Sequence, residues 1–428
     1  MKFFAVPVPI TAVLALLWSP ATQALTLVHS NDVMGDIEPC GCQGTPKGGM
    51  VRKEALLKGI EVSDLLQLDA GDLLFSTESL PKLLQTEGAL QASYLLKAME
   101  LLNHDVIVPG EKDFALGFKT FENLRSTTKI PFLAANLSRK DGKAFLKPFV
   151  ILKRKDKAGK ELRIAVIGLV GDALRWPQEL IASPAIAAAK RLVQELRPEA
   201  DLLIALTHQG HEADRQLAQA VPELDLIIGG HTQTYLQQPV YAGSTMILEA
   251  AYRNQFVGLL SPAFEKSKLI RPIPAAAYQS IALDELYDPA ATAVKTPMQK
   301  LVSEFKNAAS EALKAKEAEL NKFSPTTSEA PAETEFQTVK KCAQCHQAQH
   351  RFWKTTPHHK ALNKALNKKL PFMALKSDSV ECEHCHGPGG NHPFSGTYRK
   401  TVDEKVCLTC HRGTSDAQRK RIACKETK

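Results

Sequence analysis

Leu65-Leu-Gln-Leu-Asp-Ala-Gly-Asp72 is a short apolar run that ends in two aspartates around an alanine and a glycine. Similar runs recur along the chain and end in polar residues. The predicted strands are Leu25–His29, Leu65–Leu68, Val106–Val108, Pro131–Ala135, Ile164–Leu169, Leu202–Leu206, Leu226–Ile228 and Met246–Leu248. Amphipathic stretches such as Glu87–Leu102 and Ala185–Leu196 lie between them. This alternation of strands and helices indicates an α/β fold.

The polar residues that follow the strands carry the chemistry of this region. Ligand sites of α/β folds lie at the carboxyl ends of the strands, so we expect these residues to converge on one site. The five clusters are Ser30-Asn31-Asp32, Asp69-Ala70-Gly71-Asp72, Gly110-Glu111-Lys112-Asp113, Thr207-His208 and Gly229-Gly230-His231-Thr232-Gln233.

These clusters resemble the motifs of calcineurin-like metallophosphoesterases. The similarity is strongest to the periplasmic 5′-nucleotidase and UDP-sugar hydrolase branch, which includes the thiohydrolase of sulfur oxidation, and it extends over about Leu25–Ser280. The resemblance implies a four-layer α/β/β/α sandwich. It also implies two cations, bridged by a carboxylate, that activate water for attack on phosphorus or sulfur.

Matched position by position, the resemblance implies a set of metal ligands in this chain. They are Asp32, Asp72, Glu111, His208, His231 and Gln233. Asn136 also lies in a family-like Ala-Ala-Asn-Leu segment.

The chain departs from the family pattern at three positions. Met34 replaces a ligand histidine, and a thioether is a poor ligand for hard divalent ions. Glu111 replaces a ligand asparagine, and Lys112 replaces the histidine that assists the leaving group. The half-site of Asp72, Glu111, His208 and His231 retains donors for one divalent ion, which would be Mn, Zn or Fe. The alternative is a retained scaffold whose polar strand ends are structural.

Lys112 and Asp113 are candidate catalytic residues. Cys40 and Cys42 are further candidates, because the resemblance places their loop at the rim of the metal site. The two cysteines form a redox dithiol, replace Met34 as ligands, or make a structural disulfide in which one of them bonds to Cys424. Six of the nine cysteines are assigned to haem below, so three remain and an odd thiol is left over.

Three C-x-x-C-H motifs occupy the carboxyl-terminal part of the chain. They are Cys342-Ala-Gln-Cys345-His346, Cys382-Glu-His-Cys385-His386 and Cys407-Leu-Thr-Cys410-His411. This spacing is typical of covalent haem c attachment, in which the histidine then binds the iron. Zinc is the alternative, but four ligands per zinc do not explain a histidine directly after each second cysteine. We therefore predict three covalently bound haems.

This region resembles the multihaem cytochromes of hydroxylamine oxidation and nitrite reduction. The similarity rests on Trp353-Lys-Thr-Thr-Pro-His-His-Lys-Ala361 and on Cys382-Glu-His-Cys-His-Gly-Pro-Gly-Gly-Asn-His392. It implies that His358 and His392 are distal haem ligands, with His359 as the alternative to His358. No distal ligand is evident for the third haem, whose iron could therefore hold an open catalytic position.

An excess of positively charged residues is concentrated in the same carboxyl-terminal region. Residues 336–428 contain 18 Lys and Arg against 7 Asp and Glu, whereas the rest of the chain contains 36 against 39. The propionates of three haems would neutralise much of this excess. No groove-reading or base-stacking element is evident, so we do not expect nucleic acid as a partner.

The amino terminus resembles an export signal. Met1–Lys2 precedes an apolar run from Phe3 to Trp18 and an Ala-Thr-Gln-Ala sequence that ends at Ala24. The alternative is an uncleaved anchor, but the run is shorter than the roughly 20 residues that span a bilayer. We expect cleavage and a periplasmic protein that begins near Leu25.

The predicted domains are a signal peptide at 1–24, the metallophosphoesterase-like domain at 25–285, a helix and linker at 286–335, and a small, mostly helical three-haem cytochrome c domain at 336–428. A long helix over Pro297–Phe323 forms the connection.

Three hypotheses follow for function. The first is electron transfer through three haems to a periplasmic or membrane-associated redox partner. The second is a redox enzyme or hydrolase that acts on a small sulfur- or phosphorus-containing anion at the amino-terminal site, with the haems as electron outlet. The third is a plain phosphohydrolase joined to a cytochrome.

Overall fold

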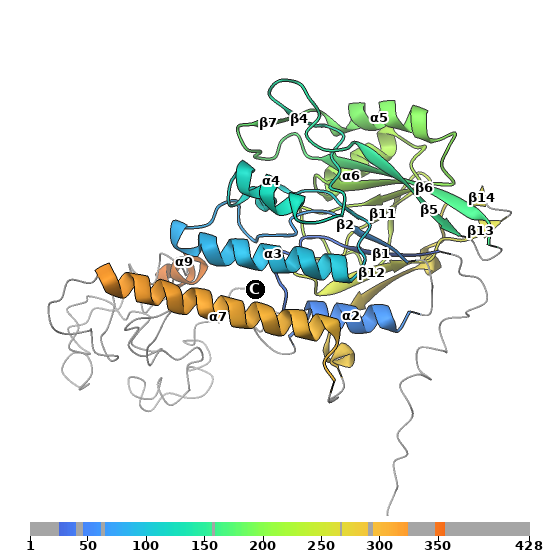
Figure 1. The fold of residues 1–428 in the computed structure, drawn as a ribbon. Coiled ribbons are helices and arrows are strands. Elements are labelled where there is room, and N and C mark those ends of the chain that lie inside the picture. Colours follow the sequence, from blue (N-terminus) through green and yellow to red (C-terminus); the bar gives the residue numbers. More distant parts are fainter. Residues whose placement is uncertain are drawn as a thin grey trace, which may run out of the picture. The chain divides into compact units, whose positions relative to one another are not determined.

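The structure is a computed structural model that describes residues 25–39, 46–60, 65–155, 159–265, 268–289, 294–323 and 347–355. The chain divides into two compact units, residues 1–314 and 315–428. The first unit is a mixed α/β structure (Figure 1). In the second unit, the described residues are the end of α7 (Pro297–Phe323) and α9 (Gln347–Thr355). None of the described helices has the length and apolar character needed to cross a bilayer.

The first sheet contains parallel strands at one side and antiparallel strands at the other. Its order is β15 (Tyr278–Ala282), β12 (Phe256–Leu260), β1 (Thr26–Ser30), β2 (Leu65–Asp69) and β3 (Val106–Ile107). β1, β2 and β3 are parallel, with Ser30 opposite Asp69 and Asp69 opposite Ile107. The loops that leave these three strands therefore start at the same edge of the sheet.

The second sheet has a parallel centre of four strands. Its order is β10 (Val240–Ala242), β11 (Thr245–Leu248), β9 (Leu226–Ile228), β8 (Leu202–His208), β6 (Glu161–Val170) and β5 (Phe149–Lys155). Strands β6, β8, β9 and β11 are parallel, with Val170 opposite His208. His208 is thus the last residue of a central strand.

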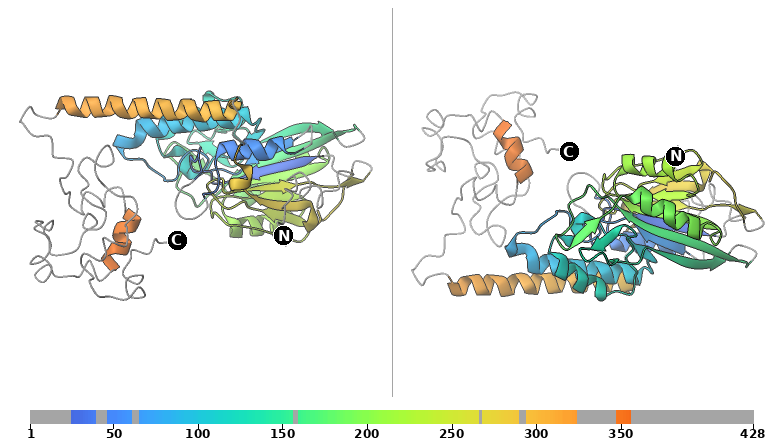
Figure 2. Two further views of the ribbon diagram at one scale, coloured as in Figure 1. Left: turned by 90° about the horizontal axis from the view of Figure 1, so that it is seen from below. Right: turned by 90° about the horizontal axis from the view of Figure 1, so that it is seen from above.

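Helices cover the outer faces of the two sheets (Figures 1 and 2). The helices of this unit are α2 (Met50–Lys58), α3 (Gln85–Leu101), α4 (Phe118–Ser126), α5 (Ala185–Leu196) and α6 (His211–Ala220), with short 3-10 helices η1 (Lys82–Leu84), η2 (Glu111–Phe114), η3 (Ala275–Ala277) and η4 (Glu285–Tyr287). Two small sheets pair β4 (Leu137–Arg139) with β7 (Leu180–Ala182) and β13 (Phe264–Glu265) with β14 (Lys268–Leu269).

Alternate side chains of the central strands enter different cores. Val166 and Ile204 belong to the largest cluster, which holds residues of both sheets and of α3. Ile167 and Leu203 belong to a second cluster with α5 and α6. A third cluster joins Val28 and its neighbours on β12 to α2. Strands buried on both faces are continuous apolar runs, and the clusters together give the expected α/β/β/α layering.

Seven of the eight predicted strands are confirmed, and one is not a regular strand. Residues 131–135 make isolated bridges, from Phe132 to Ile107 and from Leu133 to Lys147. Leu133 packs against Gly168 of β6, where an added Cβ would overlap its side chain and backbone. The segment therefore crosses from one sheet toward the other and cannot pair along its length with either. In the two large sheets, β5, β10, β12 and β15 have no counterpart among the predicted strands.

The predicted long helix is present as α7, and its first turns pack on the first unit. Met298 and Val302 are buried in the main core. The ring of Phe305 lies 5.6 Å from that of Tyr94, and Lys306 pairs with Glu38 at 2.5 Å. The start of α7 is thus part of the α/β unit rather than a free connector. The predicted signal peptide at 1–24, the linker at 324–335 and nearly all of the predicted haem module lie outside the described residues.

Gly168→Ala is expected to destabilise the first unit, because the added methyl group overlaps Leu133. Overpacking of this kind lowers the free energy of unfolding by about 1–3 kcal/mol, measurable by denaturant unfolding followed by circular dichroism. The control is Gly59→Ala, where φ is −79° and the nearest atom is 3.3 Å away. The control should change stability by less than about 1 kcal/mol. Equal effects at the two positions would contradict this packing.

Candidate metal centre

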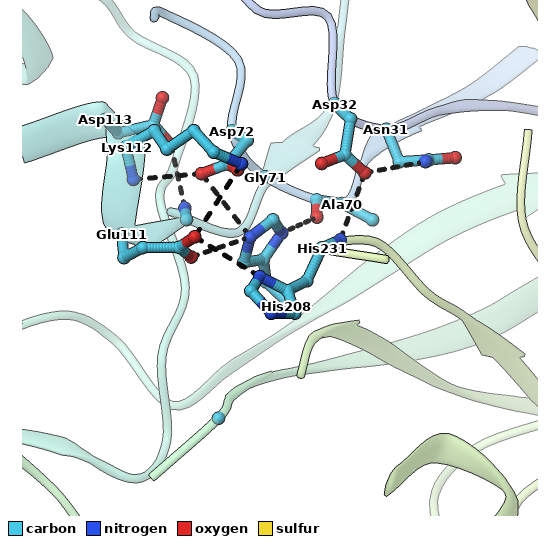
Figure 3. Close-up of polar contacts among 12 residues, drawn as sticks. Asn31, Asp32, Ala70, Gly71, Asp72, Glu111, Lys112, Asp113, His208 and His231 are labelled. Atoms are coloured by element: carbon cyan, nitrogen blue, oxygen red, sulfur yellow. Dashed lines mark hydrogen bonds and ion pairs between the residues drawn. The ribbon is translucent and has the colours of Figure 1, made fainter. Parts of the chain in front are cut away.

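Loops from both sheets bring acidic and histidine side chains together at the carboxyl ends of the strands (Figure 3). Asp32 and Asp72 follow β1 and β2, and Glu111 begins η2 after β3. His208 ends β8, and His231 follows β9. Five of the six predicted metal ligands therefore lie in one place, as the strand-end pattern predicts.

Four of these residues form a compact donor cluster. One ligand atom from each of Asp72, Glu111, His208 and His231 lies within 4.8 Å of all the others. Nε2 of His208 is 3.1 Å from Oε2 of Glu111 and 3.4 Å from Oδ1 of Asp72. Nδ1 of His231 is 3.3 Å from Oε1 of Glu111. His208 and Asp72 are fully buried, whereas the His231 side chain is 29% exposed, so the cluster opens to solvent on that side.

A backbone carbonyl on the side away from the carboxylates fixes the orientation of the His208 ring. Its Nδ1 lies 2.7 Å from the carbonyl oxygen of Ala70, which can only accept a hydrogen bond. Nδ1 therefore carries the hydrogen, and Nε2 faces the carboxylates. A backbone carbonyl that holds the far nitrogen of an imidazole is typical of metal-binding histidines.

Asp32 has one oxygen without a partner. Its Oδ2 accepts hydrogen bonds from the Asn31 side chain at 2.9 Å and from the backbone N–H of His231 at 3.0 Å. Its Oδ1 is buried and has no hydrogen-bond partner among the described residues. A buried carboxylate oxygen without a donor is unfavourable unless a cation or water satisfies it.

The backbone at the site is strained. Asp32, Met34, Asp72, His231 and Gln233 all have left-handed φ angles, of 49°, 58°, 50°, 83° and 56°. Such conformations are uncommon for residues other than glycine and cluster at functional sites.

Glycines allow the loops to approach each other. A Cβ at Gly71, whose φ is 90°, would lie 2.6 Å from Nδ1 of His208. A Cβ at Gly110 would overlap Asp72 and lie 2.7 Å from Nε2 of His208. Any side chain at these two positions would force the donors apart.

The ionisable side chains of the site strongly shift one another's pKa values. Burial acts to lower the pKa of His208, but Asp72, Glu111 and Asp32 outweigh it and hold this pKa well above its usual value. Burial acts to raise the pKa values of Glu111 and Asp72, yet the neighbouring histidines hold both below their usual range. At Asp32, burial dominates and raises the pKa. The carboxylates thus favour the protonated form of His208, and the histidines favour the ionised forms of Glu111 and Asp72.

Lys112 lies within the cluster. Its ammonium forms a short ion pair with Oδ2 of Asp72 and lies 3.7 Å from Oε1 of Glu111. Burial acts to lower the pKa of Lys112, but Asp72, Glu111 and Asp32 raise it overall. The carboxylates therefore favour the charged form of this side chain.

Asp113, predicted as a catalytic candidate, does not face the cluster. Its Oδ1 accepts a hydrogen bond from the N–H of Leu74 at 2.7 Å, and its Oδ2 from that of Gly110 at 2.8 Å. Burial and the nearby Asp72 raise its pKa to about 8. Both oxygens are used to hold the loops, so Asp113 positions Glu111 and Lys112.

The remaining predicted residues fall in three groups. Gln233 is half-exposed on the His231 loop, and Met34 is buried beside the site with its N–H donating to the Asp72 carbonyl at 2.9 Å. Asn136 holds the loops after β6 and β7 through hydrogen bonds to Val170 and Ser183. Outside the described residues lie Cys40, Cys42, Cys342, Cys345, His346, His358, Cys382, Cys385, His386, His392, Cys407, Cys410 and His411.

The loop that carries His231 is supported by residues that the sequence motifs do not indicate. Oε1 of the buried Glu249 lies 2.9 Å from Nδ1 of His211. Its Oε2 accepts hydrogen bonds from Thr232 and from the N–H of Thr234. Burial raises the pKa of Glu249 to about 7.

A second feature is a buried polar chain that links Ser30 and Asp69 to Lys53 and His104, which the motifs do not indicate. Ser30 donates to Asp69 at 2.6 Å, and the Lys53 ammonium lies 3.0 Å from Ser30 and 3.1 Å from His104. Burial lowers the pKa of Lys53 to about 8. Lys53 stands between Arg52 and Glu54 in a helix with several charged residues, so the sequence gives no signal for such a role.

The donor set fits a divalent cation. Carboxylate oxygens and imidazole nitrogens suit Mn, Zn or Fe, and the buried oxygen of Asp32 without a hydrogen-bond partner in the described part of the chain is a further candidate donor. Asp72, Glu111, His208 and His231 are the residues that would hold the ion.

Comparison with known proteins gives 5′-nucleotidases as relatives by sequence. No family model matches the chain. It is 28% identical over 257 residues to a snake venom 5′-nucleotidase of Naja atra, covering 54% of this chain and 44% of that protein. It is 30% identical over 261 residues to the human 5′-nucleotidase, covering 53% of this chain and 42% of that protein. The chain thus spans less than half the length of these relatives.

Solved structures share the fold. The 5′-nucleotidase precursor of Thermus thermophilus has a TM-score of 0.55 at 22% identity, covering 68% of this chain and 59% of its own. The sulfate thiohydrolase SoxB of Thermus thermophilus has a TM-score of 0.55 at 19% identity, covering 69% and 61%. The α/β region of this chain therefore resembles the 5′-nucleotidases and calcineurin-like phosphoesterases in sequence and fold.

Proposed function

We propose that the α/β region is a metal-dependent hydrolase for a small phosphorus- or sulfur-containing anion. The observation that carries this proposal is the donor cluster of Asp72, Glu111, His208 and His231 at the carboxyl ends of strands from both sheets. The relatives include 5′-nucleotidases and, by fold, a sulfate thiohydrolase, which are hydrolases of such anions by name.

A divalent ion in this cluster would act as a Lewis acid and lower the pKa of a bound water. Hydrogen bonds within the chain orient the side chains that would bind this ion. Ala70 holds Nδ1 of His208, so Nε2 faces the cluster and would bind the ion once its proton has left. Asp32 accepts the N–H of His231 and keeps one oxygen free.

Lys112 stabilises negative charge in this mechanism. Its pKa is raised by the surrounding carboxylates, so it remains protonated and is a poor proton donor to a leaving group. It contributes a fixed positive charge, which would attract an anionic substrate.

We further propose that residues 336–428 form a three-haem cytochrome c module that exchanges electrons with a periplasmic or membrane-associated partner. The three C-x-x-C-H motifs support this second function. On this proposal, export depends on the signal peptide at residues 1–24, and the domains are those expected from the sequence.

Asp72→Asn is expected to reduce phosphoester hydrolysis in the presence of Mn by about 100-fold or more, because it weakens a ligand and the contact to Lys112. Steady-state rates on a chromogenic phosphoester measure this. The matched control is Asp141→Asn, which changes an exposed aspartate paired with Lys143 at 3.3 Å. Absence of activity in the wild-type protein with Mn, on phosphate and thiosulfate esters alike, would overturn the hydrolase proposal.

Metal affinity is expected to rise with pH. The pKa of His208 is held above its usual value in the metal-free protein, so the ion must displace a proton from Nε2. Affinity is therefore greatest above this raised pKa and falls as pH drops below it. Calorimetric titration with Mn in buffers of different ionisation enthalpy should show proton release. A pH-independent affinity without proton release would contradict the assigned ligand.

The number of haems bound per chain tests the proposed attachment motifs. The full chain is expected to carry about three haems in a pyridine haemochrome assay, one for each motif. Cys382→Ser with Cys385→Ser should remove about one haem, whereas the control Cys424→Ser should remove none, since Cys424 lies outside the motifs. Zinc in place of haem in protein from a host able to mature cytochromes c would contradict the proposal.

A further inference from the structure

We propose that the ammonium of Lys112 replaces the second cation of a two-metal site, so that this centre holds one divalent ion beside a fixed lysine charge. The inference rests on the proposed function, because it concerns how the same cluster binds metal. It assigns to Lys112 the role of a positioning residue that excludes a second ion.

Lys112 engages both oxygens of Asp72. Its ammonium pairs with Oδ2, and its backbone N–H donates to Oδ1 at 3.0 Å. A carboxylate bridges two metal ions through both oxygens or through one oxygen that the ions share, so groups already bound to its oxygens compete with metal. Here the side of Asp72 that a second ion would use is already held by a positive group.

The lysine cannot easily leave this position. It lies in η2, whose start is fixed because Asp113 accepts hydrogen bonds from the N–H groups of Gly110 and Leu74. Only 15% of the Lys112 side chain is exposed, and Asp72 is fully buried. An ion pair of this kind differs from the mobile pairs of protein surfaces, which salt screens.

The opposite side of the site lacks the ligands for another ion among the described residues. Asp32 offers one free oxygen, but the neighbouring Met34 provides a thioether, which binds hard divalent ions poorly. The complete donor cluster of carboxylates and imidazoles lies on the side of Glu111, His208 and His231.

The charges of the site also match a single ion. Asp32, Asp72 and Glu111 are buried and together carry three negative charges when ionised. One divalent ion and one ammonium supply three positive charges. A second divalent ion would give an excess of two, and repulsion between cations a few ångströms apart is weakly screened inside a protein.

Four forms of the full chain test the proposal: wild type, Met34→His, Met34→His with Lys112→Met, and Met34→His with Lys112→Arg. The first change supplies an imidazole where the thioether stands. Methionine approximates lysine in length but carries no charge, whereas arginine is longer and keeps the charge. Bound Mn is counted by elemental analysis and calorimetry, and spin coupling between Mn ions is read by electron paramagnetic resonance.

We expect about one Mn per chain in the wild type, in Met34→His and in the Arg double variant, with the signal of isolated Mn. The Met double variant should bind about two and show the spectrum of a coupled pair. Circular dichroism and thermal unfolding confirm that each form is folded. If the Met double variant does not fold, a coupled Mn pair in a folded Met34→His protein still overturns the role of Lys112.

Two coupled Mn ions in the wild type or in Met34→His would overturn the role of Lys112, as would a single ion in a folded Met double variant. A coupled pair in the Arg double variant would also overturn it, since the charge is retained there. No bound Mn in the wild type would overturn the proposed hydrolase function itself, and this outcome is distinct from the others.

Discussion

The hydrogen bond between His208 and the carbonyl oxygen of Ala70 joins the two sheets at the site, with a length of 2.7 Å. Ala70 follows β2 of the first sheet, and His208 ends β8 of the second. The loop after β9 approaches the same carbonyl so closely that a Cβ at Gly230 would overlap it. This contact directs Nε2 of His208 at Glu111 and Asp72, and the donor cluster exists only because the sheets are held at this separation.

The strands that were easy to predict are those buried on both faces. β6 and β8 contribute to two cores, so their sequences are continuous apolar runs. β5 and β15 are only partly buried, and their sequences, Phe149–Lys155 and Tyr278–Ala282, mix apolar and polar residues. Antiparallel backbone pairing rather than burial holds these edge strands, and backbone pairing leaves a weak sequence pattern.

The sequence indicates which residues reach the site, but it does not indicate which way they point. Asp72 and Asp113 both follow a strand in a short polar loop, yet one carboxylate faces the histidines and the other accepts hydrogen bonds from two backbone N–H groups. The position of Lys112 predicted a departure from ordinary phosphoesterase chemistry. Its ion pair with Asp72 depends on side-chain direction, which follows from the packing of η2 and not from the motif.

The left-handed backbone of the site has a consequence for the order of folding. The N–H of Asp32 is held by the carbonyl of Gly71 at 2.8 Å, and the N–H of Arg253 by the carbonyl of Asp32 at 2.7 Å. These strained loops therefore hold one another through backbone hydrogen bonds to partners far away in the sequence. We expect the site to assemble late in folding and to exchange its amide hydrogens before the central strands do.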